Sequence, residues 1–254
     1  MLIGTWNVNS IRMRLGRLLQ WLESRKPDIA CLQEIKVTNE DFPVGPLKEL
    51  GYQCLVHGQK TYNGVAILTR AEAFDVVRSF PGDTDAQSRL LGCRIGELRI
   101  VNVYAPNGSE VGSEKYSYKL EWFARLRSFL DSLAAPEDPV LVCGDFNVAP
   151  DDRDVWDPEA WRGQILFSEP EKAAFRKLLE WGFSDAVRLH HTEGGIYTWW
   201  DYRGGAFHRG WGVRIDHFLL SPPLARRCRA IEVDRNERKG EKPSDHAPVL
   251  AYLD

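Results

Sequence analysis

The sequence has no long apolar run, no C-x-x-C pair and no marked excess of one charge. Its five cysteines are scattered and odd in number, and the formal net charge is −3 over 254 residues. No segment reaches the length of a membrane span, and residues 1–6 have the pattern of a strand rather than of a signal peptide. We therefore expect a cytoplasmic protein whose cysteines are reduced thiols, neither spanning a membrane nor cross-linked by disulfides.

The sequence also lacks signs of internal division. It holds no Gly/Ser-rich or Pro-rich linker, no internal repeat and no low-complexity tract. With 43% hydrophobic residues and nine tryptophans, the chain has enough apolar residues for a sizeable core, and we expect residues 1–254 to form a single domain. The near-neutral charge does not mark a polyanionic partner. A polyanion could still bind through a bound divalent metal and a local basic face.

The segment 140–147, Val-Leu-Val-Cys-Gly-Asp-Phe-Asn, carries the strongest local signal in the chain. A short apolar run bounded by turn residues predicts a strand that is buried on both faces. Because side chains alternate along a strand, Asp145 and Asn147 are expected on one side, and Phe146 on the other side toward the core. The same residue types are common in simple turns, so this segment alone does not establish a site.

Other polar clusters follow predicted strands in the same way. Asn7 and Asn9 follow the predicted strand 2–6, and Glu34 follows the predicted strand 29–32. Taken singly, such residues are more typical of the surface than of a metal site. Together, carboxylates and amides at the ends of several strands make an oxygen-rich cluster of the kind that hard divalent cations prefer.

Further elements are predicted from hydrophobic periodicity. Strands are expected at 65–69, 98–104, 215–220 and 249–253, and helices around 15–22 and over 113–133 and 173–181. The stretch 151–167 is expected to be loop and short helix. Arginines on the polar side of the first helix, Arg12 among them, either form a solvated face or contact substrate. Tyr104, at a strand end, also fits plain strand propensity.

The last third of the chain is rich in aromatic and arginine residues, which alternate in 197–203 and 207–214. On glycine-containing loops this composition suits nucleic acid, through base stacking and phosphate contacts, and the alternative is a hairpin packed on the core. Asp216 is predicted to be a buried strand carboxylate. A lone histidine is more often structural, but Asp216 would hold His246 in one tautomer, as in histidines that act on substrate.

The motifs form an ordered set that extends through the whole chain. They are Trp-Asn-Val-Asn-Ser at 6–10, Leu-Gln-Glu at 32–34 with Lys36, Asn-Gly-Val-Ala at 63–66, Tyr104, Gly-Asp-Phe-Asn at 144–147, Arg-Ile-Asp at 214–216 and Ser-Asp-His-Ala-Pro at 244–248. This set resembles exonuclease III, the bacterial DNA-repair branch of the endonuclease/exonuclease/phosphatase superfamily. Each motif is weak by itself, whereas the ordered set is specific.

The resemblance implies a DNase I-like fold, a four-layered α/β sandwich with two central sheets that are mixed and mostly antiparallel. It also implies a site for Mg²⁺ or Mn²⁺ at one edge of the sandwich. Glu34 would bind the metal with Asn7 beside it. Asp145, Asn147 and Asp245 would belong to the same cluster.

The resemblance further implies catalytic roles. Asp145 would orient or deprotonate the attacking water, and Asn147 and Tyr104 would stabilise the reacting phosphate. His246, oriented by Asp216, would contact a non-bridging phosphate oxygen. These residue types suit phosphodiester hydrolysis, which requires a nucleophilic water and neutralisation of charge on the phosphoryl oxygens.

The expected partner is double-stranded DNA with 3′ ends, nicks or abasic sites, bound by a monomer. The residues expected to contact it are Asn9, Arg12, Lys36, Asn107, Trp199, Arg203, Trp211, Val213 and Ile215. In relatives that incise abasic sites, an apolar pocket holds the flipped-out sugar, and Trp199, Val213 and Ile215 stand at the corresponding positions. Val213 is smaller than the tryptophan of some relatives, so the pocket wall is either thinner or filled by a neighbour such as Trp211.

We therefore predict a metal-dependent DNA repair nuclease. Its main activity would be 3′→5′ exodeoxyribonuclease activity, and its second would be incision at abasic sites in base excision repair. A phosphatase or phosphodiesterase of the same superfamily, acting on a small phosphate or lipid headgroup, would use the same metal core and is the alternative. A catalytically silent DNA-binding module would require a broken core, and no motif is broken.

Overall fold

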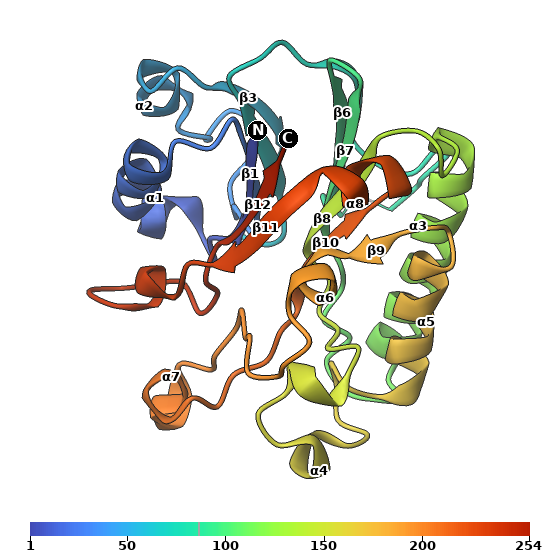
Figure 1. Cartoon of the computed structure of the whole chain (residues 1–254). Coiled ribbons are helices and arrows are strands. Elements are labelled where there is room, and N and C mark those ends of the chain that lie inside the picture. Colours follow the sequence, from blue (N-terminus) through green and yellow to red (C-terminus); the bar gives the residue numbers. More distant parts are fainter. Residues whose placement is uncertain (86) are drawn as a thin grey trace.

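The computed structural model describes residues 1–85 and 87–254, which form two six-stranded sheets lying face to face (Figure 1). One sheet contains β1 (Leu2–Asn7), β2 (Ile29–Gln33), β3 (Gln53–His57), β4 (Val65–Thr69), β11 (Cys228–Val233) and β12 (Val249–Leu253), in the order β11-β12-β1-β2-β4-β3. The other contains β5 (Phe74–Val77), β6 (Leu90–Ile95), β7 (Leu98–Tyr104), β8 (Val140–Asp145), β9 (Ser184–Asp185) and β10 (Asp216–Leu220), in the order β5-β6-β7-β8-β10-β9.

Helices cover the outer face of each sheet. The first sheet is covered by α1 (Ile11–Arg25) and α2 (Val44–Glu49), and the second by α3 (Glu114–Leu133) and α5 (Glu169–Leu179) (Figure 1). The remaining helical segments are short: α4 (Pro158–Trp161), α6 (Ala186–His190), α7 (Ala206–Arg209), α8 (Pro222–Arg227), and the 3₁₀ turns η1 (Asp152–Asp154), η2 (Arg203–Gly205) and η3 (Arg235–Arg238). This arrangement confirms the predicted four-layered α/β sandwich. Among the helices of the described residues, none combines the length and apolar character that crossing a membrane requires.

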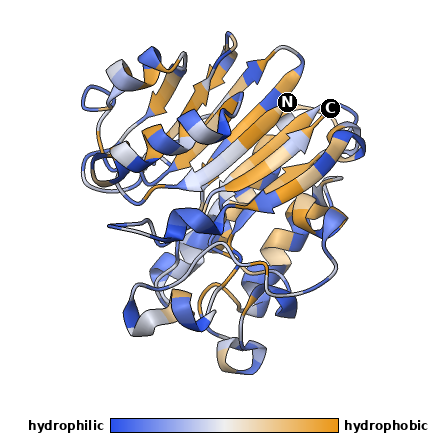
Figure 2. Cartoon of the chain, turned by 60° about the vertical axis from the view of Figure 1, so that its left-hand side comes forward, coloured by the Kyte–Doolittle hydropathy of each residue, from blue (hydrophilic) through white to orange (hydrophobic). Residues whose placement is uncertain are grey.

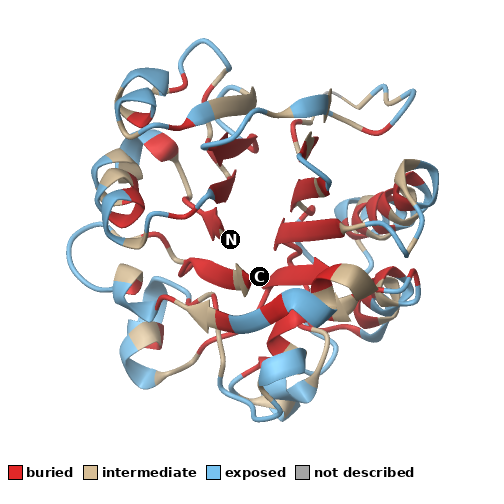
Figure 3. Cartoon of the chain, turned by 45° about the horizontal axis from the view of Figure 1, so that its top comes forward, coloured by how far each residue is buried: buried red, intermediate tan, exposed pale blue. Residues whose placement is uncertain are grey.

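Apolar residues concentrate in the strands, and the strands are buried while the outward sides of the helices are exposed (Figures 2 and 3). Alternation sends successive side chains of one strand into different cores. In β8, Leu141 and Cys143 pack between the two sheets, whereas Val140 and Val142 pack under α3 and α5. The strand is buried along its whole length, as its apolar run predicts.

Two parallel strand pairs determine where the polar strand ends meet. β1 runs parallel to β2, and β7 runs parallel to β8, so the C-terminal ends of each pair share one edge of their sheet. β10 is antiparallel to β8, and its first residue, Asp216, lies opposite Asp145, the last residue of β8. Five polar strand ends therefore converge on one edge of the sandwich.

Most predicted elements agree with the structure, and the differences have local causes. Helix α3 follows Ser113, whose hydroxyl accepts a hydrogen bond from the amide of Tyr116, and it ends at Leu133 as predicted. Helix α5 begins at Glu169, earlier than the predicted 173, because Ser168 and Glu171 form a capping box at its start. It ends at Leu179, short of the predicted 181.

Strands β3, β5, β6, β9 and β11 were not predicted from the sequence. β3 and β5 are edge strands with mostly part-exposed residues, so they lack an apolar run. β6 is buried, but Gly92 and Arg94 interrupt its apolar pattern. Their pairing with neighbouring strands, rather than local composition, gives these segments their conformation.

Candidate active site

The side chains that face the space between the sheets change from apolar to polar at one edge. In β8 the inward series Leu141 and Cys143 continues to Asp145, and Phe146 points instead toward the core under the helices. In β10, Phe218 and Leu220 belong to the inter-sheet core, and Asp216 continues their face. The candidate site is therefore the polar end of the inter-sheet layer.

A buried amide network separates the apolar core from the acidic groups. The amide nitrogen of Gln33 donates to Thr5 Oγ1 at 2.8 Å and to Asn102 Oδ1 at 2.7 Å, which joins β2 to β1 and to the opposite sheet. Asn102 donates in turn to the carbonyl oxygens of Leu32 and Ala66. These hydrogen bonds hold the two sheets at a set spacing directly beneath the site.

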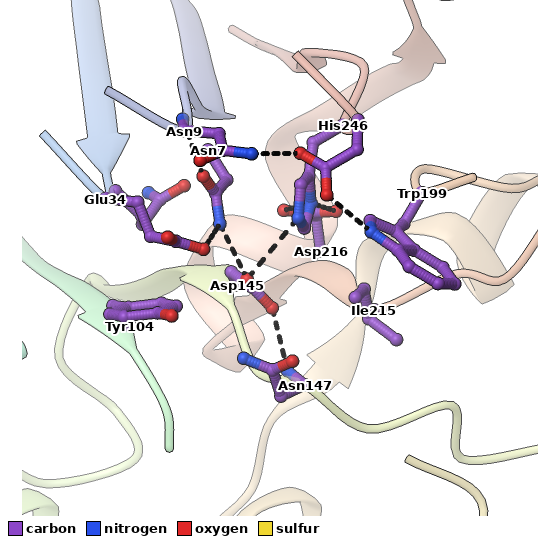
Figure 4. Close-up of polar contacts among 12 residues, drawn as sticks. Asn7, Asn9, Glu34, Tyr104, Asp145, Asn147, Trp199, Ile215, Asp216 and His246 are labelled. Atoms are coloured by element: carbon purple, nitrogen blue, oxygen red, sulfur yellow. Dashed lines mark hydrogen bonds and ion pairs between the residues drawn. The ribbon is translucent and has the colours of Figure 1, made fainter. Parts of the chain in front are cut away.

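Glu34 and Asp145 form the acidic centre of the site (Figure 4). The amide nitrogen of Asn7 lies between them and donates to Glu34 Oε1 at 2.9 Å and to Asp145 Oδ2 at 2.8 Å. Glu34 has φ 49° and Asn147 has φ 51°, a left-handed backbone that non-glycine residues adopt at a cost. Such strain is characteristic of residues that the surrounding structure holds in place for function.

Two carboxylates offer oxygen atoms to a metal ion, and a ring nitrogen of His246 lies close to them. A carboxylate oxygen of Glu34, one of Asp145 and a ring nitrogen of His246 all lie within 4.8 Å of one another. The surroundings are acidic, since Asp216 and Asp245 add two further carboxylates against the cations Lys36 and His246. Carboxylate oxygens and excess negative charge fit a hard divalent cation. The structure places Asn7 as a hydrogen-bond donor to both carboxylates, and metal ligation by its oxygen stays a prediction.

His246 is held by Asp216, as the sequence analysis expects. Its Nδ1 lies 2.9 Å from Asp216 Oδ2 and 3.1 Å from Oδ1, so Nε2 points toward Asp145 Oδ2 at 3.7 Å. Burial alone would lower the pKa of His246, but attraction to Asp216 and Asp145 outweighs it and raises this pKa to about 10. The ring is therefore a cation at neutral pH that presents Nε2–H to the site.

The surroundings of Asp145 disfavour its charged form, whereas those of His246 favour the charged form of the ring. Its Oδ1 accepts a hydrogen bond from the backbone amide of Asn147 at 2.9 Å, and the side chain is almost wholly buried. Burial, together with the nearby charges of Asp216 and Glu34, raises the pKa of Asp145 to about 7, against the attraction of His246. A carboxyl with a pKa near neutrality is suited to accept a proton during catalysis.

Two uncharged donors line the same space. Burial raises the pKa of the Tyr104 hydroxyl well above its usual value, and Glu34 and Asp145 add to this, so the hydroxyl remains protonated. The Asn147 amide donates to the carbonyl of Ala105 at 3.0 Å, and its Oδ1 accepts from the amide of Asn107 at 3.2 Å. Tyr104 and Asn147 both lie beside Asp145 (Figure 4).

Asp245 is bound by neighbouring side chains at the rim of the acidic centre. Its Oδ1 accepts from Asn9 at 2.9 Å, and its Oδ2 accepts from Trp199 Nε1 at 3.0 Å. Lys36 donates to Asn9 Oδ1 and forms an ion pair with Glu34 at 2.8 Å. Asn9, Lys36 and Trp199 are thus brought to the rim, and a direct role of Asp245 in metal binding stays a prediction.

The residues expected to form an apolar pocket lie together, and most of them are covered. Val213 and Ile215 are buried against Val155, Leu166 and Phe167, with Trp199 packed partly buried beside them. Trp211 does not pack in this cluster. It stacks on the part-exposed ring of Trp156, with 4.9 Å between ring centroids.

The remaining expected DNA contacts lie further out. Arg12 is exposed on α1 and pairs with Asp41 at 2.9 Å, and Arg203 is exposed on η2. Asn107 is exposed on the loop after β7 and reaches the acidic centre through Asn147. The structure therefore brings the catalytic and metal candidates together, whereas the candidate DNA contacts extend outward from them.

Sequence reasoning missed several buried residues that hold the site. They lie outside the motifs, and their common feature is a polar or charged side chain with little exposure: Asn102, Lys119, Asp154, Glu171, Asp185, Thr198 and His217. The hydroxyl of Thr198, for example, accepts hydrogen bonds from the amides of Ile215 and Asp216, both at 3.1 Å. One feature of the sequence could have indicated such a residue: Lys119 is a charged residue within the predicted apolar face of the helix 113–133, where a charged side chain is rare unless it is paired.

Comparisons with known proteins agree with this geometry. The model of the Endonuclease/Exonuclease/phosphatase family matches residues 4–246. Exodeoxyribonuclease III of Haemophilus influenzae is 37% identical over an alignment of 260 positions, which covers 97% of each chain. A solved 3′-5′ exonuclease from Neisseria meningitidis has a TM-score of 0.97 and 43% identity, and covers 100% of both chains. An AP endonuclease from Archaeoglobus fulgidus has a TM-score of 0.97 and 41% identity, and covers 100% of this chain and 99% of that one. The chain therefore belongs to the endonuclease/exonuclease/phosphatase family, in its exodeoxyribonuclease III branch.

Proposed function

We propose that this protein, a DNA repair nuclease of the exodeoxyribonuclease III kind, uses Mg²⁺ to remove nucleotides 3′→5′ from duplex DNA, and that incision at abasic sites is its second activity. The observation that carries the proposal is the convergence of Glu34, Asp145 and the Asp216–His246 pair at one polar edge between the sheets. Exodeoxyribonuclease III from Haemophilus influenzae and the Archaeoglobus fulgidus AP endonuclease support the two activities by their likeness to this chain.

Glu34 and Asp145 are the residues that would hold the cation, with Asn7 fixing both carboxylates. When bound, the cation supplies positive charge that offsets the negative charge developing on the phosphoryl oxygens. The residues present fit this group because they offer carboxylate oxygens in an acidic, partly buried pocket. Mg²⁺ and Mn²⁺ share this preference for hard oxygen ligands, so we propose Mg²⁺, with Mn²⁺ able to take its place.

The side chains divide the remaining chemistry among them. Asp145, a buried carboxylate beside Glu34 and His246, accepts the proton of the attacking water. His246, cationic because Asp216 and Asp145 hold its charge, donates from Nε2 to a non-bridging phosphate oxygen. Tyr104 and Asn147 donate to the same phosphate from the opposite side of the site.

The organisation of the chain supports three further parts of the proposal. The site takes residues from both sheets, so residues 1–254 act as one catalytic domain. Asn7, Glu34, Asp145 and His246 all come from one chain, which is consistent with a monomer. The five cysteines are free thiols, as expected for an enzyme that acts on chromosomal DNA in the cytoplasm.

Digestion of labelled duplexes tests the proposal. The substrates carry a blunt 3′ end, a nick or an abasic analogue, and each is incubated with Mg²⁺ and with a chelator. The expected result is shortening from the 3′ end that requires Mg²⁺, with weaker cleavage at the abasic analogue. Release of phosphate from inositol phosphates with intact DNA duplexes would refute it.

A further inference from the structure

Lys119 is a buried lysine in the second turn of α3, on the side that faces the candidate site. Its side chain has no exposure, although an ammonium group is costly to bury. The three protons of the ammonium have three acceptors: the carbonyl oxygen of Asn147 at 2.6 Å, the carbonyl oxygen of Asn107 at 3.0 Å, and Glu171 Oε1. The hydrogen-bonding capacity of this buried cation is therefore used in full.

Two of these acceptors belong to the loops that carry site residues. Asn147 is held from one side by Asp145, which accepts its backbone amide at 2.9 Å, and from the other side by Lys119, which binds its carbonyl. Between these two contacts its backbone adopts φ 51°. The ammonium group of Lys119 thus stabilises the left-handed turn at Asn147, whose side chain lies beside Asp145 (Figure 4) and donates to the carbonyl of Ala105.

Glu171 supplies the counter-charge and extends the connection to a third segment. Its carboxylate also accepts the backbone amides of Leu166 and Ser168, both at 3.0 Å. Leu166 packs against Val213 and Ile215, and its carbonyl accepts the amide of Ala149 at 2.7 Å. The ion pair therefore joins α3 and α5 to the Asn147 loop and to the apolar cluster beside it (Figure 1).

The loop after β7 is packed closely on the same side chain. Gly108 has φ +90°, and a Cβ atom placed there would lie 3.0 Å from Lys119 Cδ. A residue with a side chain would be strained at this φ and would press on the lysine stem. Loop and lysine therefore fit each other without spare room.

We propose that Lys119, held by Glu171, is a positioning residue for the nuclease reaction, which sets the backbone of Asn147 so that its amide meets the reacting phosphate. This inference rests on the role proposed above for Asn147. Lys119 itself is enclosed by protein and does not touch substrate. Its contribution is to the rate of the chemical step, with little effect on DNA affinity.

Lys119→Met tests this role because methionine has a similar length and no charge. The single-turnover rate on a 3′-labelled duplex in Mg²⁺ is expected to fall about 100-fold, the scale of a 1 Å misplacement, with the Kd for DNA changed less than about threefold. The double variant Lys119→Met with Glu171→Gln leaves no unpaired buried charge and keeps one side-chain oxygen to accept the amides that Glu171 binds. It is expected to recover part of the lost Tm but not the lost rate. Recovery of both would show that the ion pair is only structural.

Lys172 provides a matched control on α5. It is also a nearly buried lysine, with Glu169 at 3.2 Å and its Nζ 3.4 Å from the centroid of the Phe167 ring, but it contacts neither Asn147 nor Asn107. Lys172→Met is expected to lower Tm and leave the single-turnover rate within about threefold of native. An equal loss of rate in Lys172→Met would attribute the effect of Lys119→Met to general loosening and overturn the proposal.

A double-mutant cycle separates this proposal from the proposed function. If Lys119 acts through Asn147, Lys119→Met costs less than about threefold in rate when Asn147→Ala is already present. If Asn147→Ala lowers the rate and the two substitutions lower it additively, only the positioning role of Lys119 is refuted. A native rate in Asn147→Ala alone would refute the catalytic role proposed for Asn147.

Discussion

Asp145 is the residue at which the demands of catalysis and of stability oppose each other most directly. Replacing it by asparagine keeps the shape of the side chain and removes its charge. Asparagine would meet two donors, the amide nitrogen of Asn7 at 2.8 Å and the backbone amide of Asn147 at 2.9 Å. Its own amide nitrogen can accept neither, so one of these hydrogen bonds is lost.

The expected change in stability follows from the raised pKa of Asp145. A carboxyl whose pKa rises from 3.8 to about 7 is less stable in its ionised form in the folded protein than in the unfolded chain, by about 4 kcal/mol. Loss of one hydrogen bond to a buried charged group offsets about 1.5–3 kcal/mol of this. Asp145→Asn should therefore be more stable than the native protein by about 1–2 kcal/mol in chelator, which corresponds to a few degrees in Tm.

This gain has a defined pH dependence. Because the folded-state pKa is raised, protonated Asp145 stabilises the native protein fully below about pH 4, and this contribution is lost as the pH rises through about 7. The advantage of Asp145→Asn should therefore grow between about pH 4 and 7 and stay constant above that. Thermal unfolding in chelator, measured at pH 5 and at pH 8, provides the comparison.

The same substitution removes the proton acceptor of the reaction. Loss of a general base costs about 10²–10⁴-fold in rate, or about 3–5 kcal/mol in the activation barrier. Single-turnover digestion of a 3′-labelled duplex at saturating Mg²⁺ measures this, with DNA affinity measured in parallel. A rate within tenfold of native, or a lower Tm than native in chelator at pH 8, would refute the reasoning.

Four further substitutions test other parts of the site. Glu34→Gln should raise the Mg²⁺ concentration needed for half-maximal activity by about 10–100-fold or more, because loss of a residue that only supports a metal ligand already has an effect of that size. An unchanged Mg²⁺ titration would show that Glu34 is not the principal ligand. His246→Ala should lower the single-turnover rate about 10²–10³-fold through lost stabilisation of the phosphate, and a rate within tenfold of native would contradict that role. Trp199→Ala should impair incision at an abasic analogue more than 3′→5′ digestion, because a flipped-out sugar needs the wall beside Ile215; equal losses would place Trp199 in general DNA binding. Burial, and next to it the charge of Arg214, lowers the pKa of His217 to about 4. Neutral His217 therefore contributes at most about 3 kcal/mol to the free energy of unfolding above pH 6.5, and this contribution is lost as the pH falls toward 4. His217→Gln should remove this decline, so that stability falls less steeply below pH 6.5. Urea unfolding between pH 4 and 8 tests this, and identical pH profiles would contradict it.

The sequence alone was sufficient for the residues that act at strand ends. Period-two alternation predicts that Asp145 continues the inter-sheet face of β8 and that Phe146 turns to the core under the helices, as in the structure, whereas Asn147 lies beyond the end of β8 in a left-handed turn that alternation does not describe. The pairing of His246 with Asp216 was also predicted, and the resemblance to exonuclease III supported it; the structure places the two side chains in contact. Local rules predict the directions of Asp145 and Phe146 because these depend on neighbouring side chains along one strand.

The residues that hold the site were beyond local rules. Lys119 lies in α3 and Glu171 in α5, and nothing in either segment indicates that the two side chains meet beneath the Asn147 loop. The edge strands β3 and β5 were missed for a related reason, since their short, part-exposed segments become strands by pairing with β4 and β6. Pairing across a sheet depends on what lies next to a segment in space, which local composition does not record.

The residues predicted to form an abasic pocket show how little of a binding space the sequence alone can predict. The sequence alone established that Val213 is smaller than the tryptophan of some relatives, and left open whether the space is empty or filled. The tertiary structure places Val155, Leu166 and Phe167 around Val213 and Ile215, and stacks Trp211 on Trp156. Sequence determines the type and local direction of each side chain, whereas close packing of distant segments decides which space remains for a ligand.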